Sequence, residues 1–191
     1  MPKRILIING SPKKDGNTAA LIEWFAEAAG SLADIEVIRA AALKHKAPGC
    51  LSCRTCQQSA EYRCAIDDDA RPVLEKMVHA ETILFATPLY FFAASAQTKI
   101  LVDRMFSLYK WDNAANTFES PLKGKTLAVM VSAYEDVGLD AIEKPFALTA
   151  RYTGMRFASL LIANAGISGQ IRAHPTARSQ THSFARALLT S

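Results

Sequence analysis

The 191-residue sequence lacks a hydrophobic run long enough to cross a membrane. Its longest apolar-rich stretch, 83–96, is interrupted by Thr87, Pro88 and Ser95, and it falls short of the roughly 18 residues that a membrane-spanning helix needs. The apolar run at 5–8 is too brief for a signal peptide. Half of the residues are hydrophobic and 21% are charged, which excludes a disordered chain. We therefore expect a soluble, cytoplasmic protein with no membrane partner.

Aspartate, glutamate and lysine are absent from residues 151–191, which hold five arginines. The whole chain has a net charge of +4, so the part before residue 151 is close to neutral. The arginines are spread along the segment, an arrangement typical of a solvated face, although they could also attract an anion or face a partner subunit. They lack the clustering of a nucleic-acid-binding surface, so we expect no nucleic-acid partner.

Cysteine is absent outside residues 50–64, where all four cysteines follow the spacing C-x2-C-x2-C-x7-C. Without a signal peptide an oxidising compartment is not expected, which disfavours disulfides and favours metal or redox chemistry. Zinc sites usually present two separated C-x2-C pairs, whereas C-x2-C-x2-C opens a ferredoxin-type ligand set. We expect one [4Fe–4S] cluster, with zinc or unligated thiols as the alternatives. The expected ligands are Cys50, Cys53, Cys56 and Cys64.

Hydrophobic patterning alternates strands with helices along the whole chain. Near-continuous apolar runs, typical of strands buried on both faces, predict strands at 4–9, 35–38, 82–86, 125–132 and 157–164. Helical spacing and start signals predict helices at 18–29, from 71 to 79, and at 94–109, 139–152 and 175–189. Pro145 suggests a kink or a late start in the fourth helix, and 107–123 is expected to be irregular.

Five such strands with helices between them predict an α/β protein with a parallel sheet and right-handed crossovers. No internal repeat or linker is present, so we expect one domain over 1–191. In a doubly wound sheet, ligands bind beyond the carboxyl ends of the strands. The loops that follow the strands are therefore the candidate binding segments.

The loop after the first expected strand reads Gly-Ser-Pro-Lys-Lys-Asp-Gly-Asn-Thr over residues 10–18. It matches neither a Walker A loop nor the dinucleotide fingerprint G-x-G-x-x-G. It nevertheless joins a buried strand to a helix N-terminus, where free N–H groups and the helix dipole favour an anion. The alternative is a plain tight turn with Thr18 as the helix cap.

This string closely resembles the phosphate loop of the NAD(P)H-dependent FMN reductase family, whose usual form is Gly-Ser-Pro-Arg-x-x-Gly-Asn-Thr. The stretch 87–104 is also similar to the family: it has Thr-Pro-Leu-Tyr-Phe, a Ser-containing segment, Lys99 and the pair Asp103-Arg104. The resemblance implies a flavodoxin-like three-layer sandwich with strand order 2-1-3-4-5 and a bound FMN. The implied phosphate ligands are Ser11, Lys13, Gly16, Asn17 and Thr18. The implied neighbours of the isoalloxazine ring are Pro88, Leu89, Tyr90, Phe91 and, at its other edge, Ser132, Ala133 and Tyr134.

The cysteine-rich segment 49–68 resembles the compact motif of the iron–sulfur flavoproteins, a branch of the same family. It departs from that motif in its long x7 gap and in Arg63, where many relatives have Gly. Because this segment follows the second strand, we expect it on the flavin side of the molecule, either within the chain or across a subunit contact.

The resemblance implies a flavin-dependent oxidoreductase that passes electrons between the cluster and FMN and reduces a small acceptor. It further implies a ferredoxin-type donor and a homodimer or homotetramer. Since the flavin carries the reaction, no catalytic residue is expected. One alternative is an NAD(P)H-dependent FMN or quinone reductase with an empty or structural cysteine loop. Another is a non-catalytic flavin- or zinc-binding redox sensor.

Overall fold

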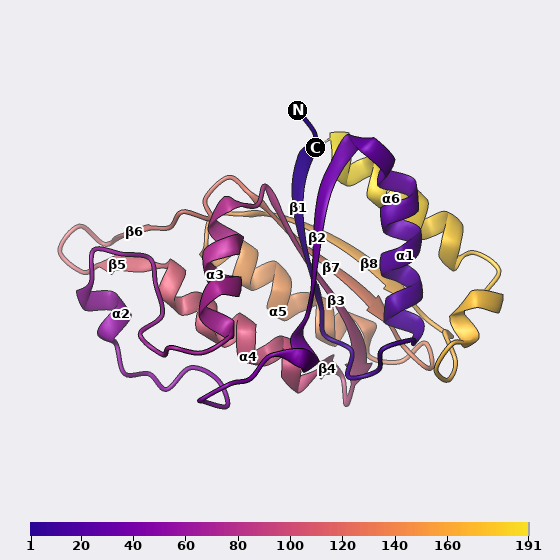
Figure 1. Ribbon diagram of the computed structural model, residues 1–191, viewed down its shortest axis with the longest axis horizontal. Coiled ribbons are helices and arrows are strands. Elements are labelled where there is room, and N and C mark those ends of the chain that lie inside the picture. The colour runs from indigo at the N-terminus through magenta and orange to yellow at the C-terminus, as the bar shows by residue number, and fades with distance from the viewer. Residues whose placement is uncertain (191) are drawn as a thin grey trace.

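The protein is built around a parallel β-sheet, as seen in a computed structural model that describes residues 1–190 (Figure 1). The strands lie in the order β2-β1-β3-β7-β8, and the short strand β4 pairs with the end of β3. Their bounds are β1 Lys3–Asn9, β2 Ala33–Arg39, β3 Thr82–Tyr90, β4 Ala93–Ala94, β7 Thr126–Ser132 and β8 Arg156–Ile162. The five parallel strands are those predicted from the apolar runs, and their order confirms the expected 2-1-3-4-5 arrangement.

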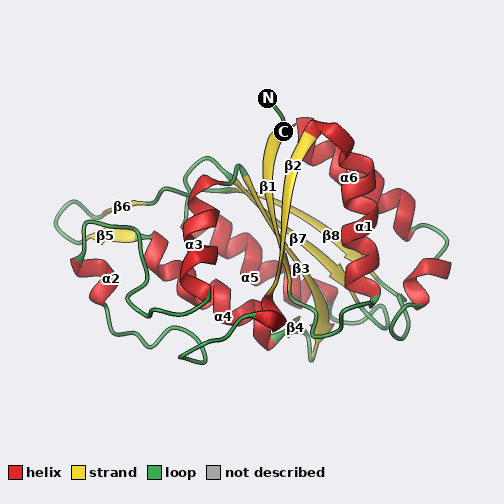
Figure 2. Cartoon of the chain, in the orientation of Figure 1, coloured by secondary structure: helices red, strands yellow, loops and turns green. Residues whose placement is uncertain are grey.

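Helices cover both faces of this sheet and form the outer layers of a three-layer sandwich (Figure 2). One layer contains α1 (Asn17–Ala29) and α6 (Ala177–Thr190). The other contains α3 (Ala70–His79), α4 (Ala96–Arg104) and α5 (Leu139–Tyr152). The short helix α2 (Thr55–Gln58) lies in the cysteine segment.

The alternation of side chains along β1 explains why two separate cores form. Successive strand residues point to opposite faces, so Leu6 and Ile8 pack with α3, α4 and α5, whereas Ile5 and Ile7 pack with α1 and α6. All four side chains are almost fully buried. Each contributes about 1.5–3 kcal/mol of transfer free energy, which makes the sheet a rigid platform for the loops at its edge.

The segment 107–123 was predicted to be irregular, and this is wrong in part. It contains an antiparallel pair, β5 (Lys110–Asp112) and β6 (Thr117–Glu119). The Tyr109 ring stacks on the rings of Phe118 and Tyr152, with centroids 5.2 and 4.7 Å apart. Because Tyr152 comes from α5, the contact that anchors this hairpin is not local in sequence.

The boundaries of α1 and α4 differ from the sequence predictions. α1 begins at Asn17 with Gly16 as its N-cap, so Thr18 is not the cap. α4 begins at Ala96 because the Ser95 hydroxyl accepts a hydrogen bond from Thr98 N, and a 3-10 turn, Met105–Leu108, follows its end. α5 has the predicted bounds, Leu139–Tyr152, and contains Pro145 in its interior, so the alternative of a late start is not observed.

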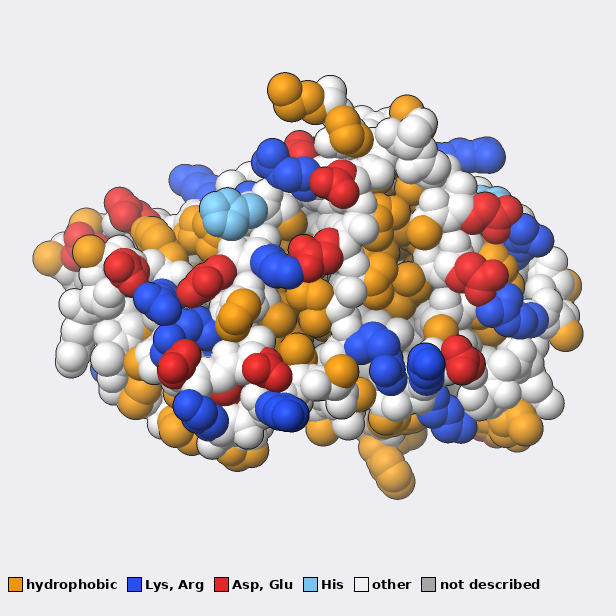
Figure 3. Space-filling view, in the orientation of Figure 1, with side chains coloured by type: hydrophobic (Ala, Val, Ile, Leu, Met, Phe, Trp, Pro, Cys, Tyr) orange, Lys and Arg blue, Asp and Glu red, His pale blue; other side chains and the backbone are white. Residues whose placement is uncertain are grey.

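Acidic side chains of α1 partly neutralise the arginine-rich C-terminal segment. Arg172 pairs with Glu23 at 2.5 Å and Arg178 with Glu27 at 2.6 Å. In Figure 3, side chains of both signs lie interspersed over this side of the molecule. Among residues 1–190, no helix is long and apolar enough to span a membrane.

Candidate functional site

A cavity of about 250 Å³ lies at the carboxyl ends of β1, β3, β7 and β8. Three of its walls come from the loops that the sequence singled out, and a fourth comes from the loop after β8. Its lining residues are Ser11, Lys13, Gly16, Asn17, Thr18, Pro88, Leu89, Tyr90, Ser132, Ala133, Tyr134, Gly166, Ile167 and Ser168. The structure therefore brings together every predicted flavin-site residue except Phe91.

The base of this cavity is the N-terminus of α1. The first helical hydrogen bond runs from Ala20 N to Gly16 O at 3.1 Å, so the N–H groups of residues 17–19 have no carbonyl partner within the helix. These N–H groups and the positive end of the helix dipole favour a bound anion. Thr18, 2% exposed, places its hydroxyl-bearing side chain at the same point.

The turn that leads into α1 is held by its own side chains. Ser11 N donates to Asn9 Oδ1 at 3.0 Å, and Lys13 N donates to Ser11 Oγ at 3.2 Å. Since the Ser11 hydroxyl accepts from Lys13, it keeps its own proton to donate to a ligand. The loop is thus a preformed concavity rather than a free segment.

Buried hydroxyl groups join the loop after β1 to the loop after β3. The Ser95 hydroxyl donates to Gly10 O at 2.6 Å and lies 3.0 Å from the Thr98 hydroxyl. Ser95 N donates to Thr87 Oγ1 at 3.1 Å. Gly10 is required at this crossing, because a Cβ there would lie 1.8 Å from Thr98 Oγ1. The two halves of the cavity are therefore fixed relative to each other.

Phe91 does not line the cavity, in contrast to the expectation that it borders the flavin ring. Phe91 and Phe92 form the two-residue turn between β3 and β4, with φ of +46° and +64°. Positive φ at both positions is the geometry of tight hairpin turns that usually select Asn or Gly. This turn leaves Phe91 99% exposed, while the Phe92 ring packs over Gly138.

Gly166, Ile167 and Ser168 were missed by the sequence reasoning. They follow β8, whose carboxyl end lies at the same edge of the sheet as those of β1 and β3. The rule that ligands bind at the carboxyl ends of parallel strands would have pointed to this loop. Its sequence contains no motif that singles it out.

The cysteine segment lies away from this cavity in its own chain. In Figure 1, which has the longest axis of the molecule horizontal, α2 and α1 lie toward opposite ends. The segment packs instead on the β5–β6 hairpin, because Gln57 Nε2 donates to Tyr109 O at 2.7 Å and Lys110 Nζ donates to Ser59 O at 2.7 Å. The expected placement on the flavin side is therefore not found within one chain.

Two of the cysteine thiols are exposed and accept hydrogen bonds from nearby residues. Ser52 N donates to Cys50 Sγ at 3.4 Å. Hydrogen bonds from the backbone and the hydroxyl of Thr55 lower the pKa of the Cys53 thiol. The contacts from Thr55 favour the thiolate form of Cys53, which is the form that binds metals and reacts with oxidants.

The other two thiols are less accessible. Burial raises the pKa of Cys56, and the charges of the nearby Cys53 and Cys64 add to this effect. Cys56 accepts a hydrogen bond from Gln57 Nε2 at 3.7 Å, and Cys64 accepts one from Arg104 Nη2 at 3.4 Å. All four sulfur atoms thus accept hydrogen bonds.

The four thiols do not converge on one point. Among residues 1–190, no group of three or more His, Cys, Asp or Glu side chains could hold a metal ion. Cys50 and Cys53 are exposed whereas Cys56 is buried, and the backbone between them is left-handed at Ser52 and Arg54, with φ of +53° and +59°. Cysteine thiolates are suitable ligands for a metal cluster, but in this arrangement the four expected cysteines are not close enough together to bind one.

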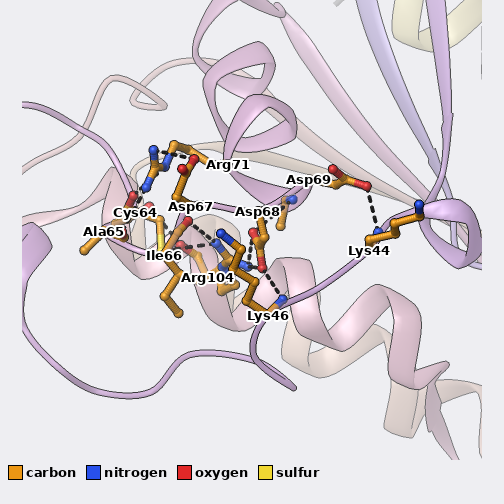
Figure 4. A network of polar contacts seen from close by, with 12 residues as sticks. Lys44, Lys46, Cys64, Ala65, Ile66, Asp67, Asp68, Asp69, Arg71 and Arg104 are labelled. Atoms are coloured by element: carbon orange, nitrogen blue, oxygen red, sulfur yellow. Dashed lines mark hydrogen bonds and ion pairs between the residues drawn. The ribbon is translucent and has the colours of Figure 1, made fainter.

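A buried ion pair fixes the C-terminal arm of the cysteine segment (Figure 4). Arg104 Nη1 lies 2.7 and 2.8 Å from the two carboxylate oxygens of Asp68, and Nη2 donates to Ile66 O at 3.1 Å. Both charged side chains are at most 1% exposed. Arg71 Nε donates to Cys64 O at 3.0 Å. The two guanidinium groups therefore hold the turn 64–68 against α3 and α4.

The pKa of Asp68 lies below its ordinary value as the net result of opposing effects. Burial by itself raises it, because the charged carboxylate loses solvation. Interactions with neighbouring residues lower the pKa of Asp68 by more than burial raises it. The largest are the hydrogen bond from Arg104, a backbone hydrogen bond from Lys46 and the positive charge of Arg104. Asp68 is therefore a carboxylate at neutral pH.

Comparison with known proteins identifies the family to which this chain belongs. The family model described as NADPH-dependent FMN reductase matches residues 3–165. The chain belongs to this family. The resemblance inferred from the motifs is thereby confirmed. The match includes the loops after β1, β3 and β7 and the whole cysteine segment.

Two curated relatives are named iron–sulfur flavoproteins. The protein of Methanocaldococcus jannaschii is 35% identical over 103 residues, which cover 53% of this chain and 51% of the relative. That of Archaeoglobus fulgidus is 36% identical over 102 residues, which cover 53% of this chain and 48% of the relative. The chain thus matches about half the length of each.

Solved structures with the same fold are flavodoxin-like reductases, which confirms the predicted fold class. An FMN-dependent NADH-azoreductase from Bacillus anthracis, in complex with FMN, has a TM-score of 0.69 at 15% identity, with 98% of this chain and 99% of that chain covered. An NAD(P)H:quinone oxidoreductase from Methanothermobacter marburgensis has a TM-score of 0.69 at 14% identity, with 99% and 98% covered. At these identities the likeness concerns the fold.

Proposed function

We propose that this protein is an FMN-dependent oxidoreductase that reduces a small acceptor with electrons from a reduced nicotinamide or an electron-carrier protein. The observation that carries the proposal is the cavity at the sheet edge, where three family-matched loops meet over the free N–H groups of α1. When bound, FMN supplies the redox chemistry, so the chain needs no nucleophile or acid–base pair of its own.

The residues around the cavity fit the two ends of such a cofactor. The N-terminus of α1 and the hydroxyl of Ser11 suit a phosphate, because they offer donors and a positive field. Pro88, Leu89 and Tyr90 offer an apolar wall to a flat ring, and Ala133 and Tyr134 line the cavity from the loop after β7. The protein part of the mechanism is to bind the cofactor, to orient it and to leave one side of the ring open to an acceptor.

Thr18→Ala is expected to raise the dissociation constant of FMN about tenfold, the usual effect of losing a hydrogen bond to a charged group. The measurement is quenching of flavin fluorescence on titration of the apoprotein. Gly16→Glu adds a negative charge beside the phosphate position and should weaken binding further. Ser179→Ala removes an exposed hydroxyl on α6, bonded to Thr176 O, and should leave binding unchanged. Full FMN affinity in both loop variants would contradict the phosphate assignment.

We further propose that the cysteine segment binds an iron–sulfur cluster. The proposal is supported by the C-x2-C-x2-C-x7-C spacing, by the hydrogen bonds to all four sulfurs and by the names of the two curated relatives. Binding requires the segment to close, because the thiols do not converge in the present arrangement. Such a cluster would supply one-electron transfer.

Purification without oxygen is expected to yield about four iron atoms per chain, with acid-labile sulfide and broad visible absorption beneath the flavin bands. Cys50→Ser with Cys53→Ser should remove the iron and leave FMN affinity unchanged, because these residues lie outside the cavity. Flavin bands without iron in the wild type would instead favour an NAD(P)H-dependent FMN or quinone reductase. Partner binding that follows the thiol state, with no reductase activity, would favour a redox sensor.

A further inference from the structure

The side chain of Asn17 has its full hydrogen-bonding capacity used within the protein. Its Nδ2 donates to Ala165 O and to Gly166 O, each at 3.1 Å. Its Oδ1 accepts from Gly169 N at 2.8 Å and from Ile171 N at 3.4 Å. A carboxamide has two N–H protons and two acceptor sites. The Asn17 side chain therefore has no group left for a phosphate, and only its backbone N–H can serve one.

These bonds tie the first residue of α1 to the loop after β8, about 150 residues away in sequence. The same loop is tied to the loop after β7, since Ala165 N donates to Ala133 O at 2.8 Å. It then supplies Gly166, Ile167 and Ser168 to the cavity. Asn17 thus controls where the fourth wall of the cavity lies relative to the phosphate loop.

Ser168 is the polar side chain that this wall presents to the phosphate loop. A Cβ built on Gly16 would lie 3.3 Å from Ser168 Oγ, so the hydroxyl stands directly beside the N-cap of α1. A hydroxyl group can donate to a phosphate oxygen. The hydroxyl and the free N–H groups of α1 therefore converge on the same end of the cavity.

We propose that Asn17 is a positioning residue rather than a phosphate ligand, and that it holds the Ser168 hydroxyl in place as a further ligand of the FMN phosphate. The assignment rests on the proposed function. The phosphate-loop motif suggests that the side chain of Asn17 binds phosphate, whereas here that side chain connects two loops. Ser168 is a binding residue that lies outside the motif.

The test compares wild type, Ser168→Ala, Asn17→Ala and the double variant by FMN titration of the apoprotein. Ser168→Ala should raise the dissociation constant about tenfold, and Asn17→Ala should raise it at least as much. Because Asn17 acts through the loop of Ser168, the double variant should bind no more weakly than Asn17→Ala alone. Asn113→Ala removes an asparagine outside the cavity and should have no effect.

Amide hydrogen exchange of residues 165–171 without FMN separates positioning from direct contact. Asn17→Ala should speed exchange in this loop, and Ser168→Ala should leave it unchanged. Additive effects on FMN binding, or unchanged exchange in Asn17→Ala, would overturn the inference. Failure of the wild type to bind FMN would overturn the proposed function and the ligand role of Ser168, while the exchange experiment would still decide whether Asn17 holds the loop.

Discussion

Arg104→Met is expected to lower the free energy of unfolding by about 3–5 kcal/mol, the usual effect of removing one partner of a buried ion pair. The substitution leaves the Asp68 carboxylate buried without its counter-charge, and it also removes the hydrogen bonds to Ile66 O and Cys64 Sγ. Urea unfolding monitored by circular dichroism at pH 7 measures the effect. Asp68 also accepts hydrogen bonds from Lys46 N and Ala70 N, which remain in the variant. Among the described contacts, Arg104 is the one cationic side chain that pairs with Asp68.

Two comparisons make this prediction specific. Arg178→Met breaks the exposed pair with Glu27 on the opposite side of the sheet and should change stability by about 0–1 kcal/mol. The double variant Arg104→Met with Asp68→Leu should be more stable than Arg104→Met alone, because no buried charge remains unpaired. Equal stability of Arg104→Met and wild type would show that this pair does not hold the segment.

The same pair predicts the direction of a pH effect. The pKa of Asp68 is lower in the folded protein than its ordinary value. A carboxyl group with a depressed pKa stabilises the fold above its unfolded pKa of about 3.9 and loses this contribution as the pH falls through the folded pKa. Arg104→Met should therefore destabilise the protein less at pH 2–3 than at pH 7.

Gly10→Ala is expected to lower the free energy of unfolding by about 1–3 kcal/mol, the usual effect of overpacking a buried site. The added Cβ would lie 1.8 Å from Thr98 Oγ1 and 3.1 Å from Ser95 Oγ, so α4 must move away from the end of β1. That movement separates the loops on either side of the cavity, and FMN affinity should fall together with stability.

The double variant Gly10→Ala with Thr98→Ala tests this cause directly. Removing the Thr98 hydroxyl eliminates the closest contact, so part of the lost stability should return. Gly16→Ala is the matched control: its φ is −126° and the nearest atom to its Cβ is the end of a side chain at 3.3 Å. Its unfolding free energy should change less than that of Gly10→Ala. No recovery in the double variant would exclude the steric cause.

Features that depend on neighbours along the chain could be predicted from the sequence. The apolar runs predicted the five parallel strands, most clearly the central strands β1, β3 and β7, which are buried on both faces and are therefore largely apolar. The loop at 10–18 and the stretch beginning at Thr87 identified the family, because such loops need particular residues at particular positions. Their meeting at one sheet edge followed from the parallel arrangement alone.

Features that depend on contacts between distant residues were decided only by the tertiary structure. Asn17 reads as a phosphate-loop residue in the sequence, but its side chain bonds to the loop 165–171. The spacing of the cysteines indicated a ligand set, yet spacing does not specify the direction of each thiol. Contacts with Tyr109 and Arg104 hold the middle of that segment, at Gln57, and its C-terminal part, at Cys64. Hydrophobic patterning and loop motifs depend on residues that are close together in the sequence. The placement of a polar side chain is set instead by whichever distant group can satisfy its hydrogen bonds once the sheet has formed.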